Sequence, residues 1–383
     1  MTCSPMRPTV LRPFNRLARP MEVIRQFTPN WFAATMGTGV LALAVRQMPI
    51  PGVQGVAEVL WWLTIGLFVL FCMLYGARWL LFFGEARRIF GHSTVSMFFG
   101  TIPMGLATIL NGGLVFGLAR WGEAVVPWIE ALWWLDVVLA LLCGVVIPYL
   151  MFTRQEHSID QMTAVWLLPV VAAEVAAASG GLLVPHLADP QGQYQVLIAS
   201  YVLWAVSLPV AFSILTILVL RMALHKLPPA SMAASSWLAL GPIGTGALGM
   251  MLLGSDAPAV FAANGLASLG EVARGLGLVA GIVLWGAGLW WLLTAVLITL
   301  RYLRQGMPFN LGWWGFTFPL GVYGLATLRL GDWLGLGFFL TFGQVLVGLL
   351  AGLWLVVAAK TLAGAWRGEL FVSPCLETQS SSR

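Results

Sequence analysis

Long apolar runs dominate this chain and restrict it to one kind of environment. Ten runs of about 18 residues or more recur along the 383 residues, and a helix of that length crosses a hydrocarbon core of roughly 30 Å. They cover approximately residues 27–46, 58–83, 95–119, 128–152, 162–184, 196–222, 235–254, 272–303, 311–328 and 334–360. Only 9% of the residues are charged, against roughly 25% in a soluble domain. We therefore predict an all-α integral membrane protein of ten transmembrane helices.

The basic residues indicate the orientation of these helices. Residues 1–26 contain five arginines without an apolar segment before the first span, so we expect no cleavable secretory signal. Such a leader also fits an organelle transit peptide, but we favour a cytoplasmic tail. With that choice, sixteen of the 20 Lys and Arg fall on the cytoplasmic side, and the opposite face holds Arg46, Arg120, Arg274 and Arg329. This split predicts an inner (plasma) membrane protein with both termini in the cytoplasm.

The same charges divide the chain into three parts. Residues 1–26 are the basic tail, 27–363 the transmembrane domain and 364–383 a cytoplasmic C-terminal tail. Because the positive charges orient the helices, they do not indicate a nucleic-acid surface.

A short element recurs in the odd-numbered runs. It reads Thr35-Met36-Gly37 in the first, and then contains Pro103, Pro169, Pro242 and Pro319 in the third, fifth, seventh and ninth. Corresponding residues are 68, 66, 73 and 77 positions apart, the length of one helical hairpin. The chain is thus predicted to form five tandem hairpins around an axis along the membrane normal.

Composition separates an inner from an outer set of helices. The odd runs are rich in Gly, Ala, Ser and Thr, as expected where helices approach closely or line a cavity. The even runs are rich in tryptophan, which we expect to face lipid near the interface. A proline inside a helix frees a backbone carbonyl, which a membrane tolerates only beside protein or water. We therefore predict that the odd helices are kinked at these prolines around a central pore; simple helix packing is the alternative.

Several polar residues lie at membrane depth. Glu174, in the middle of the fifth run, is a candidate proton site that would couple anion movement to protons, because a charge there costs at least ~2.5 kcal/mol. A neutral Glu174 bonded to a neighbouring helix is the alternative, and Asp136 ranks below it. Thr35 and Asn111, with Thr38, Thr108 and Thr245, could donate hydrogen bonds to an anion or simply join helices.

Signatures of catalysis and of metal binding are weak. The Gly244–Gly249 match to a dinucleotide-binding motif lies in an apolar run without a preceding strand. The four histidines occupy separate loops or helix ends, and Cys3, Cys72, Cys143 and Cys375 lie far apart. We therefore expect no catalytic residues, no metal and no cofactor.

Four segments together resemble the tellurite-resistance and C4-dicarboxylate transporter family. They are Phe27 to Gly39, Ser96 to Ile109, Trp237 to Gly249 and Gly312 to Thr327, and the resemblance covers nearly all of residues 25–363. The family includes yeast malate permeases, fungal sulfite efflux pumps, bacterial tellurite-resistance proteins and plant slow anion channels. The resemblance implies ten helices in five hairpins, a homotrimer with one pore per subunit, and an aromatic gate on the ninth helix.

The residues before the repeated element indicate which ring forms that gate. The five repeats carry Ala34, Ile102, Leu168, Gly241 and Phe318 at this position, so only the ninth helix offers an aromatic ring. A phenyl ring in a narrow pore blocks anions sterically and by dehydration. We predict Phe318 as the gate, with Phe316 second because the register could slip, and a Phe packed between helices as the alternative.

These observations predict transport of small anions across the membrane. C4-dicarboxylates such as malate, sulfite and other inorganic anions remain open as substrates, as do channel and carrier mechanisms. A proton-coupled carrier using Glu174 is one alternative, and an intramembrane enzyme or receptor is another. The expected partners are a small anion, membrane lipid and further copies of the chain.

Overall fold

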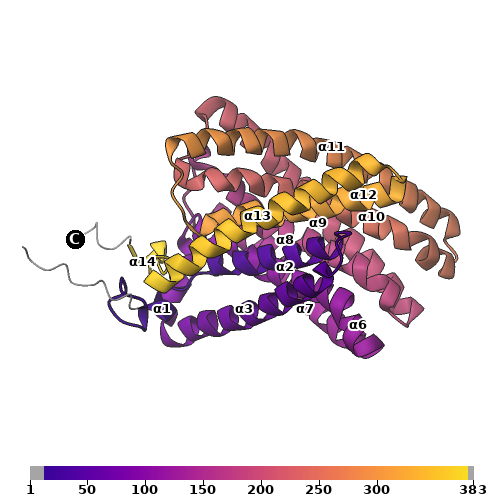
Figure 1. Ribbon diagram of the computed structural model, residues 1–383, viewed down its shortest axis with the longest axis horizontal. Coiled ribbons are helices and arrows are strands. Elements are labelled where there is room, and N and C mark those ends of the chain that lie inside the picture. The colour runs from indigo at the N-terminus through magenta and orange to yellow at the C-terminus, as the bar shows by residue number, and fades with distance from the viewer. Residues whose placement is uncertain (1–12, 378–383) are drawn as a thin grey trace, which may run out of the picture.

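The computed structural model describes residues 13–377, which are helical and contain no strand. Cys3 and three basic residues of the tails, Arg7, Arg12 and Arg383, lie outside this part of the chain. The long helices run broadly along one axis (Figure 1). They are α2 (Phe32–Arg46), α3 (Val53–Leu81), α5 (Thr101–Gly112), α7 (Val126–Thr153), α8 (Leu168–Leu183), α9 (Pro190–His225), α10 (Leu240–Ala263), α11 (Ala267–Gln305), α12 (Thr317–Leu334) and α13 (Gly337–Arg367).

Shorter helical segments connect and extend them. Four α-helices have four residues each: α1 (Glu22–Arg25), α4 (Phe83–Ala86), α6 (Leu118–Trp121) and α14 (Pro374–Glu377). The 3-10 segments are η1 (Pro29–Trp31), η2 (Arg87–Gly91), η3 (Val95–Gly100), η5 (Gly122–Val125), η6 (Ile159–Gln161), η7 (Ala164–Leu167), η8 (Val184–His186), η9 (Ala230–Ala239) and η10 (Leu311–Phe316). A π-helical segment, η4 (Gly113–Gly117), separates α5 from α6.

Seven helical stretches of the described residues are long and apolar enough to cross a membrane. They are Val53–Leu81, Val95–Thr153, Ala164–His186, Pro190–His225, Ala230–Ala263, Ala267–Gln305 and Gly337–Arg367. The second stretch contains two of the predicted spans, and α2 has only 15 residues. A membrane protein with several spanning helices is thus confirmed, whereas the count of ten spans stays a prediction.

Burial divides the helices into two classes. In the most apolar window of each stretch, 94% of the residues around α8 and 89% of those around α10 are buried. The corresponding shares are only 22% for α3, 33% for α9, 39% for α11 and 28% for α13. All residues of α2 except Arg46 are also buried. The chain thus places small-residue helices inside and Trp-rich helices outside.

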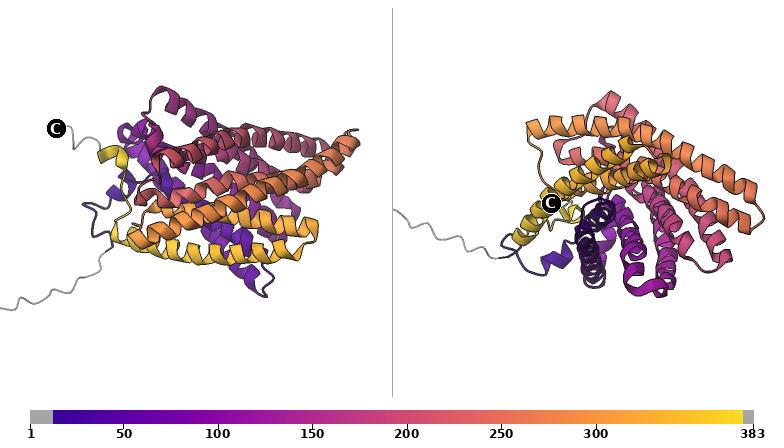
Figure 2. Two further views of the ribbon diagram at one scale, coloured as in Figure 1. Left: turned by 90° about the horizontal axis from the view of Figure 1, so that it is seen from above. Right: turned by 45° about the vertical axis from the view of Figure 1, so that its right-hand side comes forward.

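The inner helices form a closed ring. Helix α2 packs against α5, α5 against α8, α8 against α10, α10 against α12, and α12 returns to α2. Each inner helix also packs against the long helix that follows it in the chain, namely α3, α7, α9, α11 or α13. Figure 2 shows the same bundle from two further directions. The arrangement of ten spans in five hairpins stays a prediction.

Glycines let the ring close tightly. A methyl group on Gly321 of α12 would lie 2.6 Å from Val40 of α2, and one on Gly244 of α10 would lie 2.9 Å from the Tyr323 backbone nitrogen. Both distances are shorter than real contacts between such atoms, so these helices approach at positions that only glycine allows.

The four repeated prolines lie where 3-10 segments change into α-helix. Pro103, Pro169, Pro242 and Pro319 each fall within the first three residues of an α-helix, directly after η3, η7, η9 or η10. The first backbone N–H groups of an α-helix have no partner within it, so a proline there removes no helical hydrogen bond. The prolines therefore mark helix starts, and the predicted kinks stay a prediction.

Tryptophans of the outer helices turn inward and correct the expectation that they face lipid. Five indole N–H groups each donate to the inner helix of the next hairpin. The pairs are Trp61 to Ile109 O, Trp133 to Ala176 O, Trp204 to Gly246 O, Trp285 to Thr327 Oγ1 and Trp354 to Thr38 Oγ1, at 2.9–3.3 Å. The last pair joins α13 to α2 and closes the circle. A buried indole N–H needs a partner, and lipid supplies none. Only some neighbours, such as Trp62 and Trp134, are exposed.

Both described ends of the chain lie at one end of the bundle, on the left in Figure 1. The Phe14 amide donates to the Trp366 carbonyl at 2.7 Å. The buried Arg78 guanidinium donates to Phe27 O and to Ser373 Oγ, which ties α3 to both terminal segments. We call this end of the bundle the tail end. The opposite end, where α2 and α12 terminate, is called the far end.

Replacing Trp133 by Phe tests the indole pairs. We expect Trp133→Phe to lower the thermal unfolding midpoint of the detergent-purified protein by a few degrees, because it removes the bond to Ala176 and leaves a gap worth about 1–2 kcal/mol. Trp134→Phe is the matched control, since Trp134 is 40% exposed whereas Trp133 is 1% exposed. Equal midpoints for the two variants would contradict the structural role of the pairs.

Candidate functional site

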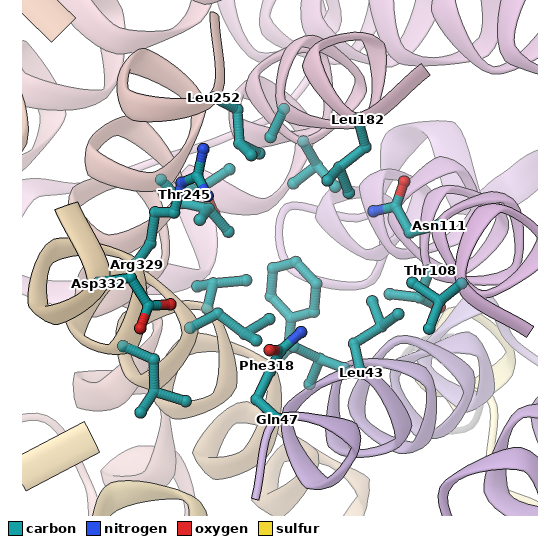
Figure 3. Close-up of a pocket in the computed structure, with 18 residues that line it drawn as sticks. Leu43, Gln47, Thr108, Asn111, Leu182, Thr245, Leu252, Phe318, Arg329 and Asp332 are labelled. Atoms are coloured by element: carbon teal, nitrogen blue, oxygen red, sulfur yellow. The ribbon is translucent and has the colours of Figure 1, made fainter. Parts of the chain in front are cut away.

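A cavity at the far end is enclosed by all five inner helices (Figure 3). It holds about 190 Å³ of space accessible to water. Apolar side chains such as Val40, Leu182, Leu248 and Val322 form most of its wall. Because residues of α2, α5, α8, α10 and α12 all contribute, the cavity lies on the axis of the ring.

Phe318 lies at the inner limit of this cavity. Figure 3 shows its ring near the middle of the lining side chains, and the residue is only 2% exposed. The same ring also lines a gap of about 10 Å³ together with Met36, Met104, Leu167, Leu168, Val171, Leu238, Gly241 and Pro319. This gap is too small for more than one water molecule and has apolar walls. We call these residues the constriction.

A second cavity lies on the other side of the constriction. It holds about 490 Å³ and opens at the tail end among η1, η9, η10 and the segment after α13. Met36, Leu168 and Leu238 line both this tail-end cavity and the constriction. The axis of the ring therefore carries two cavities separated by a short apolar barrier.

Neutral polar groups face the far-end cavity. Thr245 Oγ1 and Asn111 Oδ1 are buried and have no hydrogen-bond partner among residues 13–377. The Thr108 hydroxyl also lines the cavity but donates to Gly105 O at 2.8 Å. Figure 3 places Thr245 and Asn111 on different sides of the Phe318 ring. Buried polar atoms without a protein partner are suited to a hydrated or polar ligand.

Charged groups stand at the opening of this cavity. Arg329 and the exposed Asp332, both from the last turns of α12, are among its lining residues. The Arg329 guanidinium donates to Ser255 Oγ at 2.8 Å and lies 5.9 Å from the Trp333 ring centroid. Arg329 thus presents a fixed positive charge about three turns of helix beyond Phe318.

The structure brings some of the predicted residues to this axis and leaves others away from it. Phe318, Asn111 and Pro319 line the cavities described above. Phe316 instead packs between Trp237 and Trp313, with ring centroids 5.5 and 5.8 Å away. Thr35 donates to Phe32 O at 2.7 Å and packs against Gly105, so it joins α2 to α5.

Glu174 also lies away from the cavities. Val175 and Ala178 of α8 line the far-end cavity, whereas Glu174 is fully buried toward α9 and α10. Ser207 Oγ donates to Glu174 Oε2 at 3.2 Å, and Oε1 has no partner among the described residues. Asp136 is buried on the outer helix α7 with both carboxylate oxygens unpaired within the same residues.

Sequence reasoning did not identify the two methionines of the constriction. Leu168, Gly241 and Phe318 line it as the aligned positions would suggest, but Met36 and Met104 take the places expected for Ala34 and Ile102. Met36 and Met104 are the central residues of the repeated element in the first two repeats. Each lies two positions after the residue that we aligned with Phe318, so moving the alignment of these two repeats by two residues would have identified them.

The described residues contain no group of three or more His, Cys, Asp or Glu that could hold a metal ion.

Comparison with known proteins places most of the chain in one family. Residues 26–362 match the family described as voltage-dependent anion channel. The chain is 35% identical to a sulfite efflux pump of Arthroderma benhamiae over 352 residues, which cover 91% of this chain and 93% of that protein. It is 27% identical to an uncharacterized transporter of Methanocaldococcus jannaschii, with 92% and 97% covered. It is 24% identical to a malic acid transport protein of Schizosaccharomyces pombe, with 87% and 77% covered.

The family match covers the inner ring, the constriction, the far-end cavity and most of the residues that line the tail-end cavity. The relatives with named activities are transporters and not enzymes, in agreement with the prediction from sequence. On the match of residues 26–362, this chain belongs to the voltage-dependent anion channel family and is a membrane protein of an anion transporter family.

Proposed function

We propose that this protein passes small anions through the axis of the inner ring and that Phe318 closes this pathway. The observation that supports the proposal is the apolar constriction between two open cavities, with one aromatic ring at its far side. An anion can enter either cavity with much of its hydration, but it must lose water to pass the constriction. Displacement of the Phe318 ring would join the two cavities.

The substrates we propose are sulfite and C4-dicarboxylates such as malate. A sulfite efflux pump and a malic acid transport protein are among the relatives of this chain. Neutral donors and one arginine suit anions of low charge, because no fixed cation lies at the constriction to compensate a doubly charged ion. Monoanionic forms should therefore pass more readily than dianions.

The setting we propose is the inner (plasma) membrane, with the tail end in the cytoplasm. Most basic residues fall on the side of the termini, as the positive-inside rule requires. The ten helices form five hairpins in this proposal, within residues 27–363. The exposed apolar faces of the outer helices contact lipid and, in a homotrimer, the neighbouring subunits.

Phe318→Ala tests the gate. Removing the ring should raise anion flux into proteoliposomes about tenfold, which corresponds to about 1.4 kcal/mol off the barrier. Phe316→Ala is the control, because Phe316 packs between two tryptophans outside the cavities. Unchanged flux in Phe318→Ala, with raised flux in Phe316→Ala, would move the gate to the other ring.

Arg329→Gln tests the electrostatic role of the far-end opening. We expect flux at low ionic strength to fall about fivefold, the effect of losing about 1 kcal/mol of attraction, and the difference to shrink as salt screens the charge. Arg274→Gln removes a charge that belongs to the same predicted face but does not line the cavity. A salt-independent loss, or the same loss in Arg274→Gln, would argue against steering by Arg329.

A labelled counterflow assay decides between substrates and between channel and carrier. Proteoliposomes loaded with unlabelled malate or sulfite are diluted into trace amounts of the labelled anion. Transient accumulation of label above equilibrium is expected of a carrier, whereas a channel gives simple equilibration. Absence of flux for both anions in protein that remains folded would reject the proposed function.

Proton coupling through Glu174 is a second candidate mechanism. It is favoured by the full burial of this carboxyl group and by its Oε1, which has no partner within residues 13–377, although Glu174 lies behind the cavity wall. Under this mechanism Glu174→Gln should remove the pH dependence of transport, while the variant still transports the anion at a measurable rate. A variant that keeps the pH profile of the unmodified protein would leave Glu174 with the structural role of bonding to Ser207.

A further inference from the structure

The tail-end cavity contains a histidine whose tautomer is fixed by the backbone. The amides of Thr94 and Val95 both donate to His92 Nδ1, each at 3.2 Å. A nitrogen that accepts two hydrogen bonds cannot carry a proton, so the hydrogen of the neutral ring is on Nε2. Burial also lowers the pKa of His92, which favours the neutral ring.

The Nε2–H group of His92 is left free to serve a ligand. His92 lines the tail-end cavity and is partly buried. Within residues 13–377, Nε2 makes no hydrogen bond, whereas the neighbouring His157 pairs its Nε2 with Gln155 Oε1 at 3.0 Å. The loop before η3 therefore positions one N–H donor at this cavity.

Asn30 contributes a second polar group to the same cavity. It lies in η1, which packs against η3, and Thr101 Oγ1 donates to the Pro29 carbonyl beside it. Asn30 Oδ1 is buried without a partner among the described residues. This oxygen only accepts hydrogen bonds, so the group that Asn30 can offer to an anion is its Nδ2 amide.

Among the described residues, the side chains that line this cavity include no unpaired carboxylate. Its one lining carboxylate, Glu369, pairs with Arg16 at 3.2 Å. The carboxylates of Glu156 and Asp160 line a neighbouring cavity instead. A set of N–H and O–H donors without an unpaired carboxylate suits a weakly held anion.

We propose that His92 and Asn30, with the hydroxyl of Thr28, form an anion-binding site at the tail end. The ligand is a small oxyanion, a carboxylate or sulfite, which accepts hydrogen bonds from His92 Nε2 and Asn30 Nδ2. Since Met36 and Leu168 line both this cavity and the constriction, the site loads the anion directly before the barrier. This inference rests on the proposed function and adds a recognition site to it.

His92→Asn separates binding from loop structure. An asparagine Oδ1 can still accept the Thr94 and Val95 amides, as in an Asx turn, but the Nε2 donor is lost. We expect normal folding and an apparent Kd for sulfite or malate about tenfold higher. The Kd is measured from the rise in unfolding midpoint with anion concentration, at constant ionic strength with sodium chloride as the background salt, because chloride is not an oxyanion. The KM for flux into proteoliposomes should rise in parallel.

Two further variants complete the experiment. His157→Asn makes the same change in the adjacent loop and should leave both Kd and KM unaltered. Asn30→Asp keeps the side-chain shape but adds a negative charge, and should weaken binding by at least about tenfold.

The outcomes distinguish this site from the transport function. Unaltered Kd and KM in folded His92→Asn and Asn30→Asp, or no midpoint shift of the unmodified protein with either anion, would overturn the site. If the unmodified protein binds these anions but moves neither, the proposed function fails while the binding site stands.

Discussion

The hydrogen bonds from outer-helix tryptophans to inner helices hold the rest of the architecture in place. Each of the five joins one hairpin to the next, and the bond from Trp354 to Thr38 joins the last to the first. In the hydrocarbon core of a bilayer no water is available to accept a hydrogen bond from an indole N–H. A helix displaced by one turn would therefore leave this donor unpaired. The pairs therefore fix the depth of every inner helix relative to its neighbour. That common depth is what brings residues of five separate helices to a single constriction.

The constriction is narrow because apolar side chains, most of them large, line nearly all of it. Gly241 leaves room on α10, and the Phe318 ring of α12 lies at the same level. Met36 and Met104 complete the wall with flexible side chains, which can follow a moving ring without opening permanent gaps. Neutral donors occur only in the wider cavities on both sides. Under the proposed function, an anion is stabilised before and after the barrier but not within it, which favours passage over tight binding.

Much of this organisation could be predicted from the sequence, and the failures have clear physical causes. The repeated element identified the inner helices, and the single aromatic ring beside it identified Phe318, which lies at the constriction. The prediction that Trp61 and Trp133 face lipid was wrong. An outer helix is apolar on all sides, so its sequence does not show which face packs inward. The position of Glu174 could not be predicted for the same reason. On an inner helix that is buried on every side, burial alone does not distinguish the cavity from a helix interface.

The sequence by itself determined that the chain is a helical membrane protein with small-residue and Trp-rich helices in alternation. These properties depend on the composition and spacing of residues along the chain. Apolar runs partition into the membrane, and small residues allow helices to pack closely, so no tertiary contact is needed to infer them. Only the tertiary structure decided that the ring closes between α12 and α2, that Met36 and Met104 share the constriction with Phe318, and that His92 faces the tail-end cavity. Those features depend on the rotation and depth of each helix against its neighbours, which local sequence leaves open.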